Sequence, residues 1–255
     1  MLTAAGFESI VDEKGRMSYS GPMARISLRG VLAFFDGEMP GGRAHSNALN
    51  ALLGEELGLS LLLHALRTHG ASDVVVLDEP CTQGRSSGVR LDRWVRARRA
   101  GRSLLFQVEV KNWCAHSLGG RTLAVDADHA TVAAHAAATW RRYWDEGERR
   151  PEPEQLRKVL VPMRVPPSAG DCDVEPVACV WDVLHPRGEP TAWFDVPASG
   201  AFPHLNWFSM SAHLRTLLRA GTSELELPLP QLEQRFATVG RLVVDMRTGA
   251  PSPSP

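Results

Sequence analysis

The order of helical and extended patterns along the chain predicts an α/β protein. A long helical pattern comes first, three short apolar runs follow it, and a second helical pattern precedes one more apolar run. In chain order these elements cover residues 46–69 (helix), 73–80, 88–95 and 103–113 (strands), 127–144 (helix) and 158–165 (strand). With 255 residues and 44% hydrophobic content, the chain can bury one large core with a smaller lobe added to it.

Local features support each of these elements. The first helix is expected to begin at Ser46 or Asn47, which are good N-cap residues, and to end at Gly70. The three strands are separated by turns rich in Gly, Ser and Arg, including a predicted turn at 96–103. The second helix is rich in alanine. The expected core is therefore a helix, three antiparallel strands, a helix and a strand.

The segments on either side of this core are expected to extend it. The N-terminal region holds two apolar runs, 24–30 and 31–37, that predict a pair of strands. After the core, strands are expected in 174–186 and 191–197 and helices in 206–221 and 230–243. The predicted organisation is N-terminal strands (1–45), a core (46–166), a C-terminal α/β extension packed on the core (167–245) and a disordered tail (246–255).

Composition excludes a strongly basic protein. Lys and Arg together number 28 and Asp and Glu 29, so any contact with nucleic acid must be local. The four cysteines show no CxxC spacing, and no signal peptide or long apolar run is present. These features predict a reduced, soluble, cytoplasmic protein without a membrane contact.

Glu109 and Lys111 lie two residues apart in the third predicted strand. Side chains alternate between the two faces of a strand, so Glu109 and Lys111 share one face while Val108 and Val110 share the other. One interpretation is an ion pair on a solvated edge strand. The other is a functional site, and further acidic residues nearby would favour it.

Three further carboxylates are candidates for such a site. Asp92 lies in the second predicted strand, seventeen positions before Glu109, which allows the two to lie side by side on adjacent antiparallel strands. Glu56 interrupts a stripe of leucines in the first helix and needs a cationic partner or a cleft. Glu55 is the competing helix residue, and the simplest interpretation is that both glutamates are solvated.

Carboxylates that converge with a lysine suit phosphodiester hydrolysis. Mg²⁺ prefers oxygen ligands, keeps several waters, and is usually held by one or two carboxylates together with substrate phosphate. A lysine ammonium group can orient the attacking water and offset negative charge in the transition state.

These residues resemble the PD-(D/E)XK nuclease superfamily, which includes restriction endonucleases, Holliday-junction resolvases and many defence nucleases. The resemblance covers roughly residues 46–166 and rests on Asp92, the Glu109-Val110-Lys111 triplet, the helix glutamate and the order of elements. It implies a restriction-endonuclease-like core with Asp92, Glu109 and Glu56 as ligands of Mg²⁺ or Mn²⁺, Lys111 as the catalytic lysine, and Glu56 or Glu55 as the helix carboxylate. Leu91 stands where the family name has proline.

The resemblance also implies an activity and partners. We expect a metal-dependent endonuclease, with DNA favoured over RNA, that acts in a bacterial restriction or anti-phage system beside a helicase, ATPase or sensor protein. A homodimer is left open. Two other classes stay open: a non-catalytic nucleic-acid-binding or protein-interaction module that keeps the fold, and a small-molecule hydrolase that uses the same metal.

Local positive charge offers candidate contacts to nucleic acid. Guanidinium groups bind phosphate in a bidentate manner, so the arginine run between the second and third strands could hold a nucleic-acid backbone. The candidate residues are Arg93, Arg96, Arg98, Arg99 and, near the mouth of the cleft, His116. A solvated charged hairpin and an ordinary loop histidine are the simpler interpretations.

Overall fold

A computed structural model describes residues 9–11, 17–19, 23–35, 42–84, 88–114, 123–124, 127–144, 157–182, 191–198, 200–229, 232 and 234–235. Within these residues the chain is an α/β protein with one six-stranded mixed sheet, two two-stranded antiparallel sheets and four α-helices. The predicted class is confirmed. The helices are α1 (Leu28–Phe35), α2 (Gly42–Thr68), α3 (His129–Trp144) and α5 (Met210–Arg219).

The six-stranded sheet has the strand order β4-β5-β6-β7-β9-β8. Its strands are β4 (Ser72–Leu77), β5 (Arg93–Arg99), β6 (Arg102–Cys114), β7 (Asp173–Asp182), β9 (His204–Ser209) and β8 (Trp193–Pro197). Strands β4, β5 and β6 form an antiparallel meander. Strands β6, β7 and β9 run parallel to one another, and β8 pairs antiparallel with β9 at the edge of the sheet. Parallel neighbours need a crossover, and α3 lies in the one between β6 and β7.

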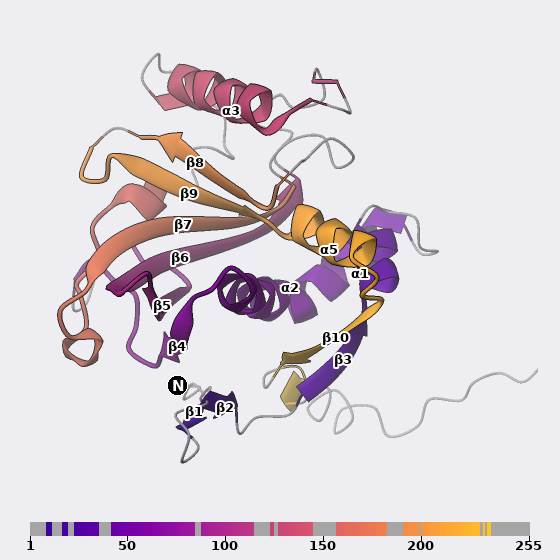
Figure 1. Cartoon of the computed structure of the whole chain (residues 1–255), viewed down its shortest axis with the longest axis horizontal. Coiled ribbons are helices and arrows are strands. Elements are labelled where there is room, and N and C mark those ends of the chain that lie inside the picture. The colour runs from indigo at the N-terminus through magenta and orange to yellow at the C-terminus, as the bar shows by residue number, and fades with distance from the viewer. Residues whose placement is uncertain are drawn as a thin grey trace, which may run out of the picture.

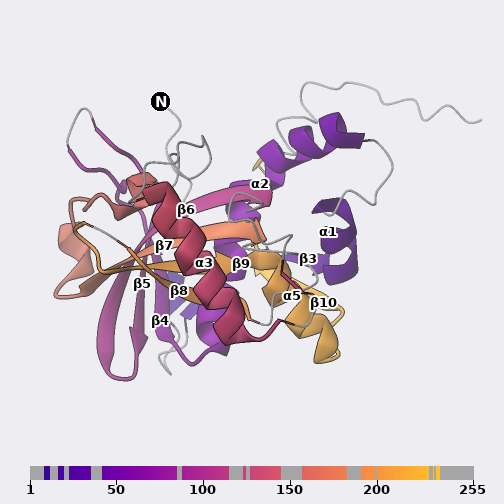
Figure 2. The same ribbon diagram turned by 90° about the horizontal axis from the view of Figure 1, so that it is seen from above.

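Helices cover both faces of this sheet (Figures 1 and 2). On one face α1, α2 and α5 share a core with Leu104, Phe106 and Val108 of β6. On the other face α3 shares a core with Leu105. Strand β6 is therefore covered on both sides, and Glu109 and Lys111, which alternate with Val108 and Val110, fall on the α3 face.

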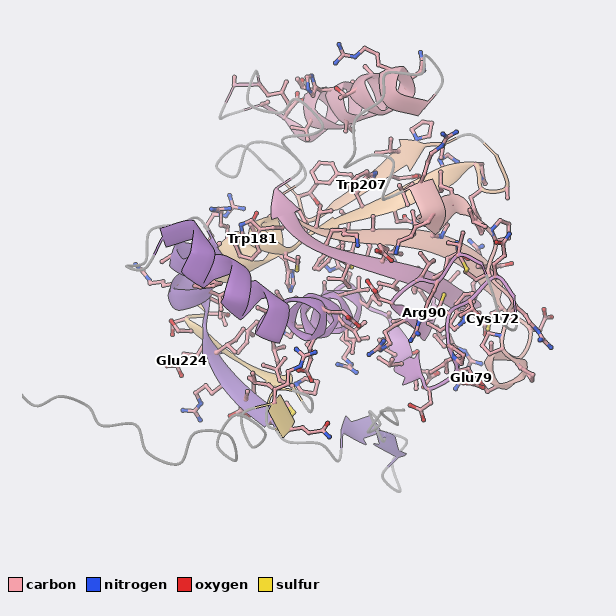
Figure 3. All side chains as sticks on the ribbon, turned by 180° about the vertical axis from the view of Figure 1, so that it is seen from behind. Glu79, Arg90, Cys172, Trp181, Trp207 and Glu224 are labelled. Atoms are coloured by element: carbon pink, nitrogen blue, oxygen red, sulfur yellow. The ribbon has the colours of Figure 1, made fainter. Side chains whose placement is uncertain are left out.

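Tryptophans fill both cores (Figure 3). Trp181 of β7 is 1% exposed on the face of α2, and Trp207 of β9 is fully buried on the face of α3. Large rings of this kind contribute much of the apolar area that a core buries. The two tryptophans anchor β7 and β9 in the cores, and β7 pairs with β6, which carries the polar residues Glu109 and Lys111.

Helix α2 approaches β6 at Gly58. A Cβ atom added there would lie 2.5 Å from Val110 Cγ1 and 3.1 Å from Met210 Sδ. A carbon–carbon distance of 2.5 Å is far below ordinary contact, so only glycine fits at this point without movement of the strand. The helix therefore sets the position of the backbone between Glu109 and Lys111.

Replacing Gly58 by alanine is expected to destabilise the fold by about 1–3 kcal/mol, because overpacking costs more than the roughly 1 kcal/mol of helix propensity gained. Gly30→Ala in α1 is the matched control, since its Cβ would lie 3.4 Å from Ser27 Cβ. The control should leave stability unchanged or raise it. Urea unfolding of both variants measures the difference, and equal stability of the two would contradict the close packing at Gly58.

The predicted N-terminal strand pair is wrong. β3 (Met23–Ser27) is a strand, but the second run lies mostly in α1. Ser27 Oγ accepts a hydrogen bond from Gly30 N at 3.2 Å, as a helix N-cap does, and Leu28 and Leu32 are buried one turn apart. β3 pairs instead with β10 (Glu224–Pro228), and the other small sheet joins β1 (Ser9–Val11) to β2 (Met17–Tyr19).

The predicted strand at 158–165 is also wrong. Lys158–Leu160 form a short 3-10 helix, η3, and Pro162 follows it. Proline has no N–H for a strand ladder. The backbone oxygens of Val159 and Val161 instead accept hydrogen bonds from the Gln107 side chain. The strand beside β6 is β7.

The β5–β6 hairpin is placed later in the chain than the sequence predicted. Asp92 directly precedes β5 instead of lying inside a strand, and the turn consists of Ala100 and Gly101. Both turn residues have positive φ, 49° and 80°, as the favoured two-residue hairpin turn requires. The arginine-rich segment is therefore a strand, in which Val95 and Ala97 are buried.

The C-terminal predictions are partly confirmed. β7 overlaps the predicted strand at 174–186, which it precedes by one residue, and β8 lies within the one predicted at 191–197. Residues 206–221 begin as β9, and helix α5 starts only after Ser209, whose side chain caps it. Most of 230–243 and all of 246–255 lie outside the described residues. In the part of the chain that is described, no helix has both the length and the apolar character needed to cross a membrane.

Candidate active site

Asp92 is hydrogen-bonded to β6 at the start of β5. Asp92 N donates to Val108 O at 3.0 Å, and Asp92 Oδ2 accepts from Val110 N at 2.7 Å. Val110 lies between Glu109 and Lys111, so this second bond holds Asp92 beside both. The expected closeness of Asp92 to the Glu109-Lys111 segment is therefore found, although Asp92 reaches it from a bend and not from a strand.

Glu109 is the centre of the site. It is 0% exposed, and its Oε1 lies 2.6 Å from Lys111 Nζ and 2.7 Å from Lys158 Nζ. Burial and the nearby Asp92 carboxylate raise the pKa of Glu109 above its usual value, although both lysines oppose this shift. Because β6 pairs with strands on both sides, the interpretation of a solvated edge strand is wrong, whereas the predicted ion pair is present.

Lys158 is the site residue that sequence reasoning missed. It belongs to η3, and besides Glu109 its Nζ contacts Arg90 O at 3.2 Å. The whole sequence holds only three lysines, Lys14, Lys111 and Lys158, against 25 arginines. Two of the three meet at one buried carboxylate oxygen. The rarity of lysine in this sequence is a signal that could have identified Lys158, because a compact ammonium group and a forked guanidinium group are not interchangeable.

Of the two helix glutamates, Glu55 is coupled to Asp92. Glu55 Oε1 lies 3.2 Å from Arg93 Nη1. Burial, and then the Asp92 carboxylate, raise the pKa of Glu55. Glu56 is 4% exposed within the leucine stripe, so the interpretation that both glutamates are solvated is wrong. Glu55 thus lies at the Asp92 side of the site, and a metal-binding role for Glu56 stays a prediction.

The donor set fits Mg²⁺ held by two carboxylates. Glu109 Oε2 is buried and accepts no hydrogen bond from any described residue, so it has a lone pair to offer to a cation. No three His, Cys, Asp or Glu side chains come together as a metal-binding group in the described part of the chain. A site of Asp92 and Glu109 would therefore need water and substrate oxygens as its other ligands, which is the usual arrangement for Mg²⁺.

The candidate arginines do not form one surface. Arg93 pairs with Glu55 on the α2 side, and Arg96 Nη1 donates to Ser168 O at 2.9 Å on the other side of β5. Arg98 lies 4.0 Å from Asp73, and Arg99 lies at the far end of the strand. His116 lies outside the described residues. Of the four arginines, Arg93 is therefore the one next to the site.

In comparisons with known proteins, no protein-family model, curated protein or solved structure gives a significant match.

Proposed function

We propose that the chain is a divalent-metal-dependent nuclease of the PD-(D/E)XK type. The observation that carries the proposal is the hydrogen bond from Val110 N to Asp92 Oδ2, which brings an aspartate next to the Glu-x-Lys triplet. The buried Glu109 Oε2, free of hydrogen bonds from described residues, supports a cation there. Both features are what two-carboxylate phosphodiester hydrolysis requires.

The arrangement of elements supports the same proposal. The chain runs α2, β4, β5, β6, α3, β7, with the first three strands antiparallel and the fourth parallel to the third. This is a helix, three strands, helix, strand order like that of the superfamily, with β7 in the place of the strand that was expected at 158–165. The candidate residues lie at the end of the β5–β6 pair that is opposite the hairpin turn, near the start of β5 and the last residues of β6. Fold analogy alone does not establish an activity, so the site carries the proposal.

The residues of the chain have distinct roles in the proposed reaction. Lys111 donates a hydrogen bond to the attacking water and offsets negative charge on the phosphorane-like transition state. Lys158 approaches the same Glu109 oxygen from η3. From there its ammonium group would hold a non-bridging phosphate oxygen of the substrate. Asp92 and Glu109 would hold Mg²⁺, which when bound supplies Lewis-acid polarisation of the phosphate. Glu55 keeps Arg93 in place beside them.

A second candidate, a non-catalytic module with this fold, is favoured by one observation. Glu109 Oε1 already contacts two ammonium groups, and lysines that neutralise a carboxylate weaken its attraction for a cation. In that case the three charges would be a structural cluster. Binding of Mn²⁺ or Mg²⁺ separates the two candidates, because a structural cluster would bind neither.

Cleavage assays test the proposed activity and identify its substrate. Plasmid, linear duplex DNA, single-stranded DNA and RNA are each incubated with the protein and Mg²⁺ or Mn²⁺, and with EDTA as the control. We expect metal-dependent cleavage of a DNA substrate, with DNA preferred to RNA. Hydrolysis of free nucleotides without any cleavage of a polymer would instead indicate a small-molecule hydrolase.

Replacing Lys158 by alanine is expected to move the acidic limb of the pH–activity profile to higher pH. Glu109 must be ionised to act, and Lys158 lowers its raised pKa. Without Lys158 the pKa rises further, so more alkaline conditions are needed for ionisation. The measurement is kcat/KM against pH for both proteins. An unchanged acidic limb would contradict the coupling between Lys158 and Glu109.

A further inference from the structure

A concave site lies near the start of β6, whereas Glu109 and Lys111 lie toward its end. It is a cavity of about 520 Å³, a volume typical of small-molecule sites. Strands β6, β7, β9 and β8 line it where they pass the C-terminal end of α2. Its β6 residues include Phe106, which faces α2, so the strand itself separates the cavity from Glu109.

Aromatic and aliphatic side chains give the cavity an apolar wall. Trp193 of β8, Phe106 of β6 and Leu66 of α2 all line it. Trp193 packs against Phe208 with ring centroids 5.0 Å apart, which holds the indole in place. A tryptophan ring held in place can stack on a planar ring of a ligand, because stacking uses the faces of both rings and needs no hydrogen bond.

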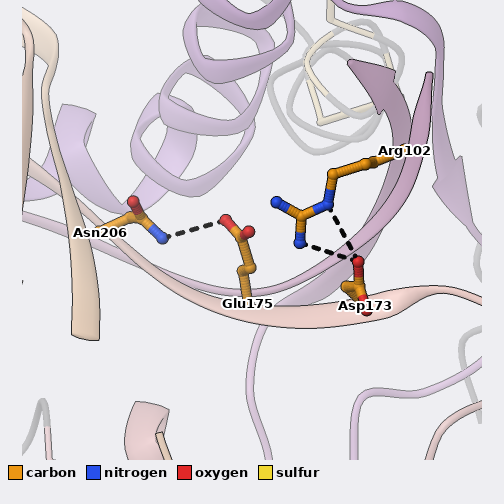
Figure 4. A network of polar contacts seen from close by, with 4 residues as sticks. All are labelled: Arg102, Asp173, Glu175 and Asn206. Carbon is orange, nitrogen blue, oxygen red and sulfur yellow. Dashed lines mark hydrogen bonds and ion pairs between the residues drawn. The ribbon is translucent and has the colours of Figure 1, made fainter. Parts of the chain in front are cut away.

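The floor of the cavity is polar. Glu175 and Asn206 lie on neighbouring strands, and Asn206 Nδ2 donates to Glu175 Oε2 at 3.4 Å (Figure 4). This bond is long, so the carboxylate can still accept hydrogen bonds. Asp195, whose Oδ1 lies 3.1 Å from His204 Nδ1, adds a second acid to the lining. The two carboxylates therefore favour a ligand that presents hydrogen-bond donors at this part of the cavity.

Cationic side chains lie on the wall near the turn between β5 and β6. Arg102 is held by Asp173, whose Oδ2 accepts from its Nε at 3.2 Å and its Nη2 at 2.8 Å (Figure 4). The side chain of Arg99 is exposed and makes no hydrogen bond or ion pair with any other residue that the structure describes. Its guanidinium group is available to a phosphate.

We infer that this cavity binds a free guanine nucleotide. The base lies against Trp193, its N1–H and 2-amino group donate to Glu175, and the phosphate is held by Arg99. Guanine presents these two donors side by side to one carboxylate, which the other common bases do not do. The inference is independent of the proposed nuclease activity, because no cavity residue belongs to the Asp92–Glu109 site.

Isothermal titration of the full chain with GMP, AMP, CMP, UMP, guanosine and inorganic phosphate tests the inference. GMP is expected to bind at least about tenfold more tightly than the other nucleotides. Arg99→Ala should weaken GMP about tenfold and leave guanosine unchanged, and Glu175→Gln should remove the preference for GMP over AMP. Arg219→Ala, an exposed arginine of α5, is the control and should bind GMP as the wild type does.

Several results would overturn the inference. They are no binding of GMP, equal affinity for the four nucleotides, and inorganic phosphate binding as tightly as GMP. Loss of GMP binding in Lys111→Ala but not in Arg99→Ala would place the nucleotide at the Glu109 site instead. Arg99 and Glu175 are outside the buried core, so circular dichroism should show that both variants fold.

Discussion

Replacing Lys111 by alanine is expected to reduce metal-dependent cleavage about 10²- to 10⁴-fold. Lys111 Nζ lies 2.6 Å from Glu109 Oε1 and is the ammonium group on the same strand face as that carboxylate. Its loss removes the donor that orients the attacking water and the charge that offsets the transition state. Single-turnover cleavage rates at saturating Mg²⁺ measure the effect on the chemical step without the step of product release.

Arg219→Ala is the control for this experiment, because it removes a positive charge from the surface of α5 far along the chain from the site. It should cleave as the wild type does. Because Lys158 contacts the same oxygen of Glu109, Lys111→Ala should still fold, and urea unfolding checks this. Cleavage by Lys111→Ala within threefold of the wild-type rate would rule out the role given to Lys111.

Replacing Glu109 by glutamine is expected to lower the cleavage rate at least about 100-fold. It is also expected to make the variant increasingly more stable than the wild type as the pH rises. Burial raises the pKa of Glu109, so the folded protein holds this proton more tightly than the unfolded chain. The neutral carboxyl of Glu109 contributes its full stabilisation below the ordinary pKa near 4.5. This contribution is lost as the pH rises through the raised pKa of the folded state. Glutamine does not titrate and avoids this loss.

Urea unfolding at several pH values from about 4 to 8 measures this second effect. The stability of Glu109→Gln relative to the wild type should increase with pH by about 1.4 kcal/mol for each unit by which the folded pKa exceeds the unfolded one. A constant difference in stability across this range would show that Glu109 titrates alike in the folded and unfolded states. This result would leave the cleavage prediction for Glu109→Gln untouched, because that prediction is tested by the cleavage rate alone.

The sequence predicted those features that depend on local pattern. The stripe of leucines in 46–69 predicted α2, and two-residue alternation placed Glu109 and Lys111 on one face of β6. Asp92 was identified because it was a polar residue in an apolar run. Its exact element was missed, because the positive φ values of Ala100 and Gly101 moved the hairpin turn later than the Gly and Arg content suggested.

Features that depend on distant contacts were not predicted. The strand pairing of β3 with β10 joins residues such as Arg25 and Glu226 that are 201 positions apart in the chain, so no local pattern in residues 24–30 could indicate it. Residues 158–165 have the composition of a strand, but β7 occupies the place beside β6 and the Gln107 side chain binds the backbone of this segment. That contact also brings Lys158 to Glu109, which is why the second lysine of the site was missed.

The central claim is that Asp92 and Glu109 form a metal site, and calorimetric titration of Mn²⁺ tests it most directly because it needs neither a substrate nor a partner protein. Wild-type protein is compared with Glu109→Gln and with the control Arg219→Ala. The account predicts that wild type and control bind Mn²⁺ alike and that Glu109→Gln binds it at least about 100-fold more weakly. Failure of the wild type to bind Mn²⁺ would contradict the account and identify Glu109, Lys111 and Lys158 as a structural ion cluster.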